Sequence, residues 1–178
     1  MGPRHSKADI LDAALAAALD DGLSQLTFGR LAKRLGISDR TIVYYFPSKD
    51  ELLRDVVLAM GAQLQDALTK AFTTPAPGHR ELMAAAWPIV ATPENDRIFA
   101  LFFEVNGLAA VGREPYRELV TMLVGVWIDW AASFIEGTPA RRRAEAETAI
   151  ALLDGLLLLR QLAGPEAADR AARACGIR

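Results

Sequence analysis

The chain has 178 residues, of which 52% are hydrophobic and 24% are charged, and its formal net charge is -2. This length supports one ordinary hydrophobic core or a small domain fused to a larger one, and the single cysteine, Cys175, excludes an internal disulfide and a cysteine cluster for a metal. The N-terminus lacks the apolar segment of a signal peptide, and uncharged runs such as 119–128 fall well below the roughly 18 residues of a membrane span. We therefore expect a soluble, cytoplasmic protein with no membrane partner, no metal and no cofactor.

Apolar residues at helical spacing, separated by helix-ending residues, predict an all-α fold along the whole chain. The first helix passes through 10–19 and ends at Gly22, and Thr27 caps a second helix that ends at Gly36. Ser38 caps a short third helix over 39–45, which Pro47 terminates. Further helices are expected at about 48–72, where Ser48 and Glu51 form a capping box, and at 80–91, 96–110, 115–136, 140–162 and 166–175.

The second and third predicted helices meet across Gly36-Ile37-Ser38 as a helix-turn-helix, in which the later helix lies in the DNA major groove. Ile37, Ile42 and Phe46 would dock this short helix. Up to residue 55 the chain has eight basic and eight acidic residues, so a basic face depends on their placement. The expected DNA-contacting residues are Thr27, Lys33, Arg34, Ser38, Asp39, Arg40, Thr41, Val43, Tyr44, Tyr45 and Lys49. The residues expected to neutralise phosphates are Arg4, Lys7, Lys33 or Arg34, and Lys49. A plain helical corner with exposed tyrosines is the alternative interpretation.

The residues from Ile10 to Leu53 resemble the DNA-binding domain of the tetracycline-repressor (TetR) family. The matching pieces are Ile10-Leu11-x-Ala13-Ala14, Leu26-Thr27, Leu31-Ala32, Leu35-Gly36-Ile37-Ser38, Thr41-Ile42 and Tyr44-Tyr45-Phe46-Pro47-Ser48-Lys49-x-Glu51-Leu52-Leu53. The later segment Leu152-Leu153-Asp154-Gly155-Leu156 is similar to one in the family's second-last helix. Asp39, Arg40 and Val43 depart from the family's usual residues, which affects the operator sequence rather than DNA binding.

The resemblance implies a helix-turn-helix domain at 1–47 and a helical effector-binding and dimerisation domain at 48–178. It implies a ligand-responsive transcriptional regulator and not an enzyme. The expected partners are double-stranded operator DNA, a small-molecule effector and a second copy of the chain. We expect a repressor that leaves its operator when it binds a small, largely apolar effector.

The second half of the chain has more aromatic surface than a small helical bundle needs, and a cavity with few polar groups is the usual form of a ligand site. The expected pocket residues are Met60, Trp87, Phe99, Phe103, Asn106, Tyr116, Val120, Leu123 and Trp127. The alternative is that these aromatic residues are core. Glu104 either reads a cationic ligand, faces solvent or pairs with an arginine.

The helix over 140–162 is apolar nearly all round from Leu152 to Leu159, and a helix that is apolar on every side is buried on every side. One side can pack on its own domain and the other on a twin, in a two-fold four-helix interface with the alanine-rich last helix. The expected interface residues are Leu152, Leu153, Leu156, Leu157, Leu159, Ala168 and Ala172.

Two other functions compete with a ligand-responsive regulator. An all-helical carrier or enzyme could use the aromatic pocket, but His5 lies in the N-terminal tail and His79 in a Pro/Gly turn, and no carboxylate pair or nucleophile motif is evident. An architectural DNA-binding protein without an effector is the third interpretation.

Overall fold

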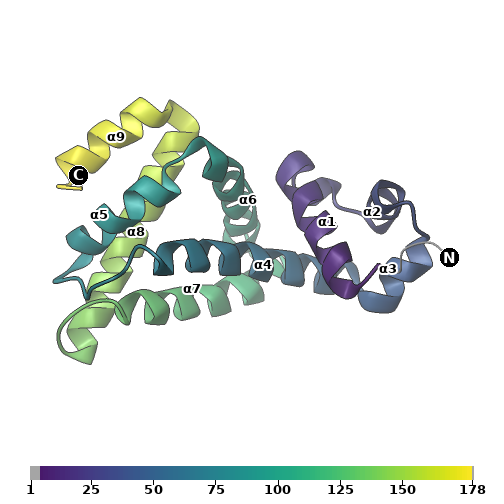
Figure 1. The fold of residues 1–178 in the computed structure, drawn as a ribbon, viewed down its shortest axis with the longest axis horizontal. Helices are drawn as coiled ribbons and strands as arrows, with labels where there is room; N and C mark the ends of the chain where they lie inside the picture. Colours follow the sequence, from purple (N-terminus) through teal and green to yellow (C-terminus); the bar gives the residue numbers. More distant parts are fainter. Residues whose placement is uncertain (1–4, 178) are drawn as a thin grey trace.

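The computed structural model describes residues 5–177, and within them the chain forms helices and no β-strand, which confirms the all-α prediction. Figure 1 shows the short helices α1–α3 at one end of an elongated molecule and α5, α8 and α9 at the other, with α4 running between them. The helices are α1 (Lys7–Asp21), α2 (Phe28–Leu35), α3 (Asp39–Tyr45), α4 (Lys49–Thr69), α5 (His79–Val90), α6 (Pro93–Ala110), α7 (Tyr116–Ala132), α8 (Pro139–Ala163) and α9 (Pro165–Ala174).

Helix caps explain most of these boundaries. The Thr27 hydroxyl accepts a hydrogen bond from the Arg30 amide at 3.3 Å, and the Ser48 hydroxyl accepts one from the Glu51 amide at 3.1 Å. The reciprocal bond of the predicted capping box at Ser48 is not formed. A complete capping box lies instead at the start of α1, between Ser6 and Asp9. Each cap satisfies a backbone donor that a helix N-terminus otherwise leaves unpaired.

Three features differ from the sequence prediction. Ser38 occupies the cap position of α3, but its hydroxyl lies 3.1 Å from the Thr41 hydroxyl and makes no capping bond. A 3₁₀ turn, η1 (Leu23–Gln25), separates α1 from α2. Helix α7 ends at Ala132 because the chain leaves it to pair with Ala76, whose amide donates to the Phe134 carbonyl at 2.7 Å.

The hydrophobic core is continuous from the small helices into the larger half. The first cluster joins the fully buried Ile10, Ile42 and Phe46 to residues of α4, α6 and α7. Two further clusters bind α5, α7, α8 and α9 together, and α4 contributes Leu68 to one of them. Because α4 contributes to the core at both ends, its orientation is set by both halves of the molecule.

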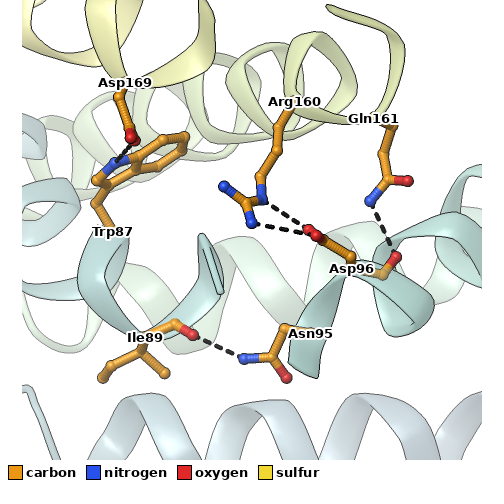
Figure 2. A network of polar contacts seen from close by, with 7 residues as sticks. All are labelled: Trp87, Ile89, Asn95, Asp96, Arg160, Gln161 and Asp169. Carbon is orange, nitrogen blue, oxygen red and sulfur yellow. Dashed lines mark hydrogen bonds and ion pairs between the residues drawn. The ribbon is translucent and has the colours of Figure 1, made fainter. Parts of the chain in front are cut away.

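A polar network holds the first turn of α6 to α8 (Figure 2). The Arg160 side chain is buried, and its Nε and Nη2 donate to the two oxygens of Asp96 at 2.6 and 3.1 Å. Gln161 donates to the Asp96 carbonyl at 2.9 Å. A buried guanidinium requires such a partner, because an unpaired buried charge is strongly unfavourable. The start of α6 is therefore held at a defined place on α8.

No helix among residues 5–177 is long and apolar enough to cross a membrane.

Candidate nucleic-acid interface and effector pocket

Helix α3 is docked on one side and open on the other. Ile42 and Phe46 are completely buried, whereas Val43 is 43% and Tyr44 79% exposed. Tyr45 is half-buried and meets Tyr44 edge to face, with ring centroids 4.9 Å apart. A short helix that buries one face and presents a large aromatic side chain on the other has the form of a reading helix in a helix-turn-helix.

Around α3, the other predicted DNA-contacting residues fall into exposed and partly covered positions. Ser38, Asp39 and Arg40 are exposed at its start, and Thr41 is half-buried. Thr27 is exposed, although its hydroxyl is used by the α2 cap.

The predicted phosphate-binding cations differ in whether they already have a partner. Lys33 and Lys49 are exposed and make no ion pair among the described residues. Arg34 pairs with Asp20 at 2.9 Å, and Lys7 pairs with Asp55 at 2.9 Å and lies 5.0 Å from the centre of the Phe46 ring. Arg4 lies outside the described residues. Among the described residues, the structure therefore leaves Lys33 and Lys49 without an ion-pair partner, and places Lys7 and Arg34 in contacts within the protein.

A cavity of about 130 Å³ lies between α4, α6, α7 and α8. Six of the nine predicted pocket residues line it: Met60, Phe99, Asn106, Val120, Leu123 and Trp127. The lining is almost entirely apolar, and its polar members are few, as is usual for a small-molecule site.

Trp87, Phe103 and Tyr116 do not line this cavity. The Trp87 ring nitrogen donates to Asp169 on α9 at 3.2 Å, and Tyr116 packs against the first core cluster, where burial and then Glu104 raise its pKa. Phe103 lies against Phe102, with ring centroids 5.3 Å apart. The face of α6 that meets the cavity includes Phe99, Phe102 and Asn106, at positions i, i+3 and i+7, so a stripe drawn at i+4 selected the wrong phenylalanine.

Asp154 on α8 also lines the cavity, and the sequence prediction missed it. Burial raises the pKa of its carboxyl from an ordinary value of 3.8 to about 6. No hydrogen bond or ion pair within residues 5–177 engages this side chain. A lone acid inside the otherwise apolar run 152–159 was the sequence signal that would have identified it.

Glu104 faces away from the cavity and joins α6 to the DNA-reading end. Its two carboxylate oxygens accept hydrogen bonds from the Leu23 and Ser24 amides of η1, at 3.1 and 3.2 Å. None of the three sequence-based interpretations of Glu104 included this contact. Gly22 is required beside it, because its φ is +84° and a Cβ there would lie 3.3 Å from the Glu104 carboxylate. Arg97 on α6 adds a 2.9 Å ion pair to Asp20 on α1.

Comparison with known proteins identifies the DNA-reading end. Residues 10–56 match the family model of bacterial regulatory proteins of the tetR family. Residues 10–56 therefore form a DNA-binding domain of the tetR-family type. The matched span contains α1, the helix-turn-helix of α2 and α3, and the first part of α4. No curated protein matches the sequence.

Solved structures extend the likeness from this domain to the fold of the whole chain. A transcriptional regulator from Rhodococcus sp. Rha1 superposes with a TM-score of 0.75 at 20% identity, over 94% of this chain and 92% of that one. A TetR transcription regulator from Haloarcula marismortui gives 0.75 at 18% identity, over 96% and 94% of the two chains. A protein assigned as a transcriptional regulator from Saccharomonospora viridis, in complex with choline, gives 0.73 at 21%, over 94% and 92%. At these identities the likeness establishes the fold.

The predicted dimer interface requires correction. Leu156 and Leu157 on α8, and Ala168 and Ala172 on α9, are buried inside the protomer and cannot meet a second copy. Leu153 is half-buried and lines the cavity, and Leu159 is half-buried. Between residues 151 and 162 of α8, the apolar residues that remain exposed are Ala151, Leu152, Gly155, Leu158 and Leu162. The nearly all-apolar run concealed which of its sides faces outward, because the helix packs on α5, α6, α7 and α9 at once.

Proposed function

We propose that the protein is a TetR-family transcriptional regulator that binds a palindromic operator as a homodimer and leaves it when a small, largely apolar effector enters the cavity. We divide the chain at residue 47 into a helix-turn-helix domain and an effector-binding and dimerisation domain. The observation that carries the proposal is a set of residues shared by the two functions. Val57, Met60 and Val105 line the cavity and belong to the same core cluster as Ile42 and Phe46, which dock the reading helix.

DNA reading is assigned to the exposed face of α3. Arg40, Val43 and Tyr44 are exposed there and suit contact with base edges and the thymine methyl group. Lys33 and Lys49 flank it and suit phosphates, which fix register without carrying sequence information.

Dimerisation is assigned to the exposed stripe of α8. Leu158 is 41% and Leu162 78% exposed, and they share this stripe with the small residues Ala151 and Gly155. A Cβ on Gly155 would meet nothing within 4 Å, so the position offers space for close approach of a second helix. Two-fold pairing of this stripe would bury apolar surface that a monomer exposes, and would place two reading helices on one duplex.

The coupling runs through α4 and α6, which each meet both the cavity and the reading end. On α6, Phe99 and Asn106 face the cavity while Glu104 holds the turn that precedes α2. An effector that prefers one placement of α6 changes the separation of the two reading helices. Only a separation close to one helical turn of DNA, about 34–36 Å, fits two successive major grooves.

The experiment has two stages. Selection from a random duplex pool with the full chain is expected to return an inverted repeat. In the first stage of ligand screening, small molecules are sought that raise the melting temperature of the wild type but not that of a Leu123→Trp variant, in which the indole ring fills the cavity. These molecules are then titrated into operator-free and operator-bound protein.

The coupling expected for an allosteric protein is about 1–3 kcal/mol, so effector affinity should be roughly 5- to 150-fold weaker on the operator complex. The operator must weaken by the same factor when effector is bound, because linkage is reciprocal. Equal affinity for the two forms would contradict effector-driven release. If no duplex in the pool binds the protein, the assignment of α3 as the DNA-reading helix is wrong.

A further inference from the structure

We propose that the cavity binds an organic cation, a quaternary ammonium or protonated amine on an apolar body, with the Asp154 carboxylate as its counter-ion. This inference rests on the proposed function only in taking the bound cation to be the effector. The shape of the cavity would suit any small apolar molecule, and the proposal adds a positive charge as a requirement for the ligand.

The first argument is that Asp154 is the charged member of an otherwise neutral lining. It projects from α8 among Leu153, Phe102 and Trp127, and Asn106 on α6 is the polar side chain that shares the cavity with it. Water-poor apolar surroundings disfavour an unpaired carboxylate, which needs a cation or a hydrogen-bond donor. No residue in 5–177 supplies either to Asp154, whose carboxylate is half-buried and keeps some contact with solvent, so a bound cation would take the place of water there.

The second argument is that no described cation on the helices packed against α8 forms an ion pair with Asp154, and that several charged groups on these helices have other partners. The partners of these groups are Arg160 for Asp96, Arg143 for Asp129, Trp87 for Asp169 and Glu145 for His79. Glu104 and Arg97 on α6 contact η1 and α1. Burial is the cause of the raised pKa of Asp154, about 6, so the carboxyl is still largely ionised at neutral pH.

The third argument concerns the walls and the size. Phe99, Phe102 and Trp127 line the cavity, and aromatic faces attract cations, most strongly where water is excluded. A volume of about 130 Å³ corresponds to roughly ten water-sized groups, since one water needs about 10–15 Å³. A cation of this size, with apolar substituents, satisfies the charge, the aromatic rings and the apolar wall together.

The test uses two probes of the same shape and different charge, phenyltrimethylammonium and tert-butylbenzene, with calorimetry or competition binding to the full chain. The variant is Asp154→Asn, which keeps the side-chain size. The control is Asp66→Asn on the exposed part of α4, which removes the same charge outside the cavity. N,N-dimethylbenzylamine, protonated at these pH values, separates a hydrogen-bonded ammonium from a quaternary one.

At pH 7.5 we expect the cation to bind the wild type and Asp66→Asn alike, and Asp154→Asn about tenfold or more weakly. Wild-type affinity for the permanently charged probe should fall about tenfold from pH 7.5 to 5, because the ionised fraction of a carboxyl with a pKa of about 6 falls by that factor. tert-Butylbenzene should bind Asp154→Asn at least as well as the wild type. Tighter binding of the protonated amine than of the quaternary probe would support the proposal with a hydrogen bond to Asp154.

Equal cation binding by wild type and Asp154→Asn, or affinity that falls as pH rises, would overturn the proposal. Operator binding separates it from the proposed function. If the cation binds through Asp154 and operator affinity does not change, the cation site stands and effector-driven release fails. If both probes weaken operator binding in the wild type and in Asp154→Asn alike, effector-driven release is supported and the role of Asp154 as counter-ion is refuted.

Discussion

The contact between Glu104 and η1 gives the sharpest prediction, because it is a polar joint between the half that holds the cavity and the helix-turn-helix end. Glu104→Ala removes both acceptors of the Leu23 and Ser24 amides, which lie 3.1 and 3.2 Å from the carboxylate. Hydrogen bonds to a charged acceptor contribute about 1.5–3 kcal/mol each. Glu104 is half-buried and Ser24 exposed, so water replaces part of the loss and the lower value applies, giving about 3 kcal/mol for the pair.

This loss should appear as easier local opening of the turn. A change of about 3 kcal/mol corresponds to roughly 100-fold faster hydrogen exchange at the Leu23 and Ser24 amides. The Leu31 amide, bonded to the Thr27 carbonyl within α2 at 3.0 Å, should exchange as in the wild type. Glu136→Ala, which removes an exposed acid beyond α7, is the matched control.

Native-state hydrogen exchange followed by NMR is the assay, and operator titration with effector is the functional readout. We expect the effector-induced change in operator affinity to shrink in Glu104→Ala, because α6 then holds the reading end through fewer contacts. Unchanged exchange at Leu23 and Ser24, or an unchanged effector response in a variant with fast exchange, would refute the role of this joint.

Three further predictions test the remaining assignments. Lys33 and Lys49 give about four phosphate contacts per dimer, so log affinity for operator should fall with log salt at a slope of roughly -4. Lys49→Ala should reduce the slope by about 2, and a slope near zero would exclude duplex binding. Leu158→Glu should give folded monomers by sedimentation velocity, and a Leu158→Glu variant that stays dimeric would relocate the interface. Leu157→Ala, inside the protomer core, should instead cost about 2–5 kcal/mol of unfolding free energy. Burial raises the pKa of Asp154 in the folded state from 3.8 to about 6, so folded protein binds this proton more tightly than unfolded protein. As pH rises from about 4 to 7, the unfolding free energy of the wild type should therefore fall by about 3 kcal/mol relative to that of Asp154→Asn, and should then stay level. If urea unfolding at several pH values shows no such difference, this carboxyl is not buried.

The helices and the DNA-reading motif could be predicted from sequence because their signals are local. Gly22 and Gly36 mark the ends of α1 and α2, with positive φ values of 84° and 66°, and Thr27 and Ser48 cap the helices that follow. A cap or a stop acts within one turn of its own helix, so neighbours in sequence are sufficient to recognise it.

The pocket was predicted in part, for a geometric reason. The apolar stripes of α6 and α7 located Phe99, Asn106 and Trp127 correctly, because a stripe indicates that a helix face is buried. Periodicity does not say which neighbour covers which side of a helix that is apolar nearly all round. Phe102 was therefore passed over for Phe103, and Leu157 was placed on an interface although its own protomer buries it.

The sequence by itself determined the helices, their order and the short reading helix with Tyr44 outward, since each depends on contacts a few residues apart. Only the tertiary structure decided the roles of Glu104 and Asp154. Glu104 meets amides 81 and 80 residues earlier in the chain, and Asp154 is desolvated by helices distant in sequence. A carboxylate's function depends on the donors and the dielectric around it, and here the packing of α4, α6, α7 and α8 sets both.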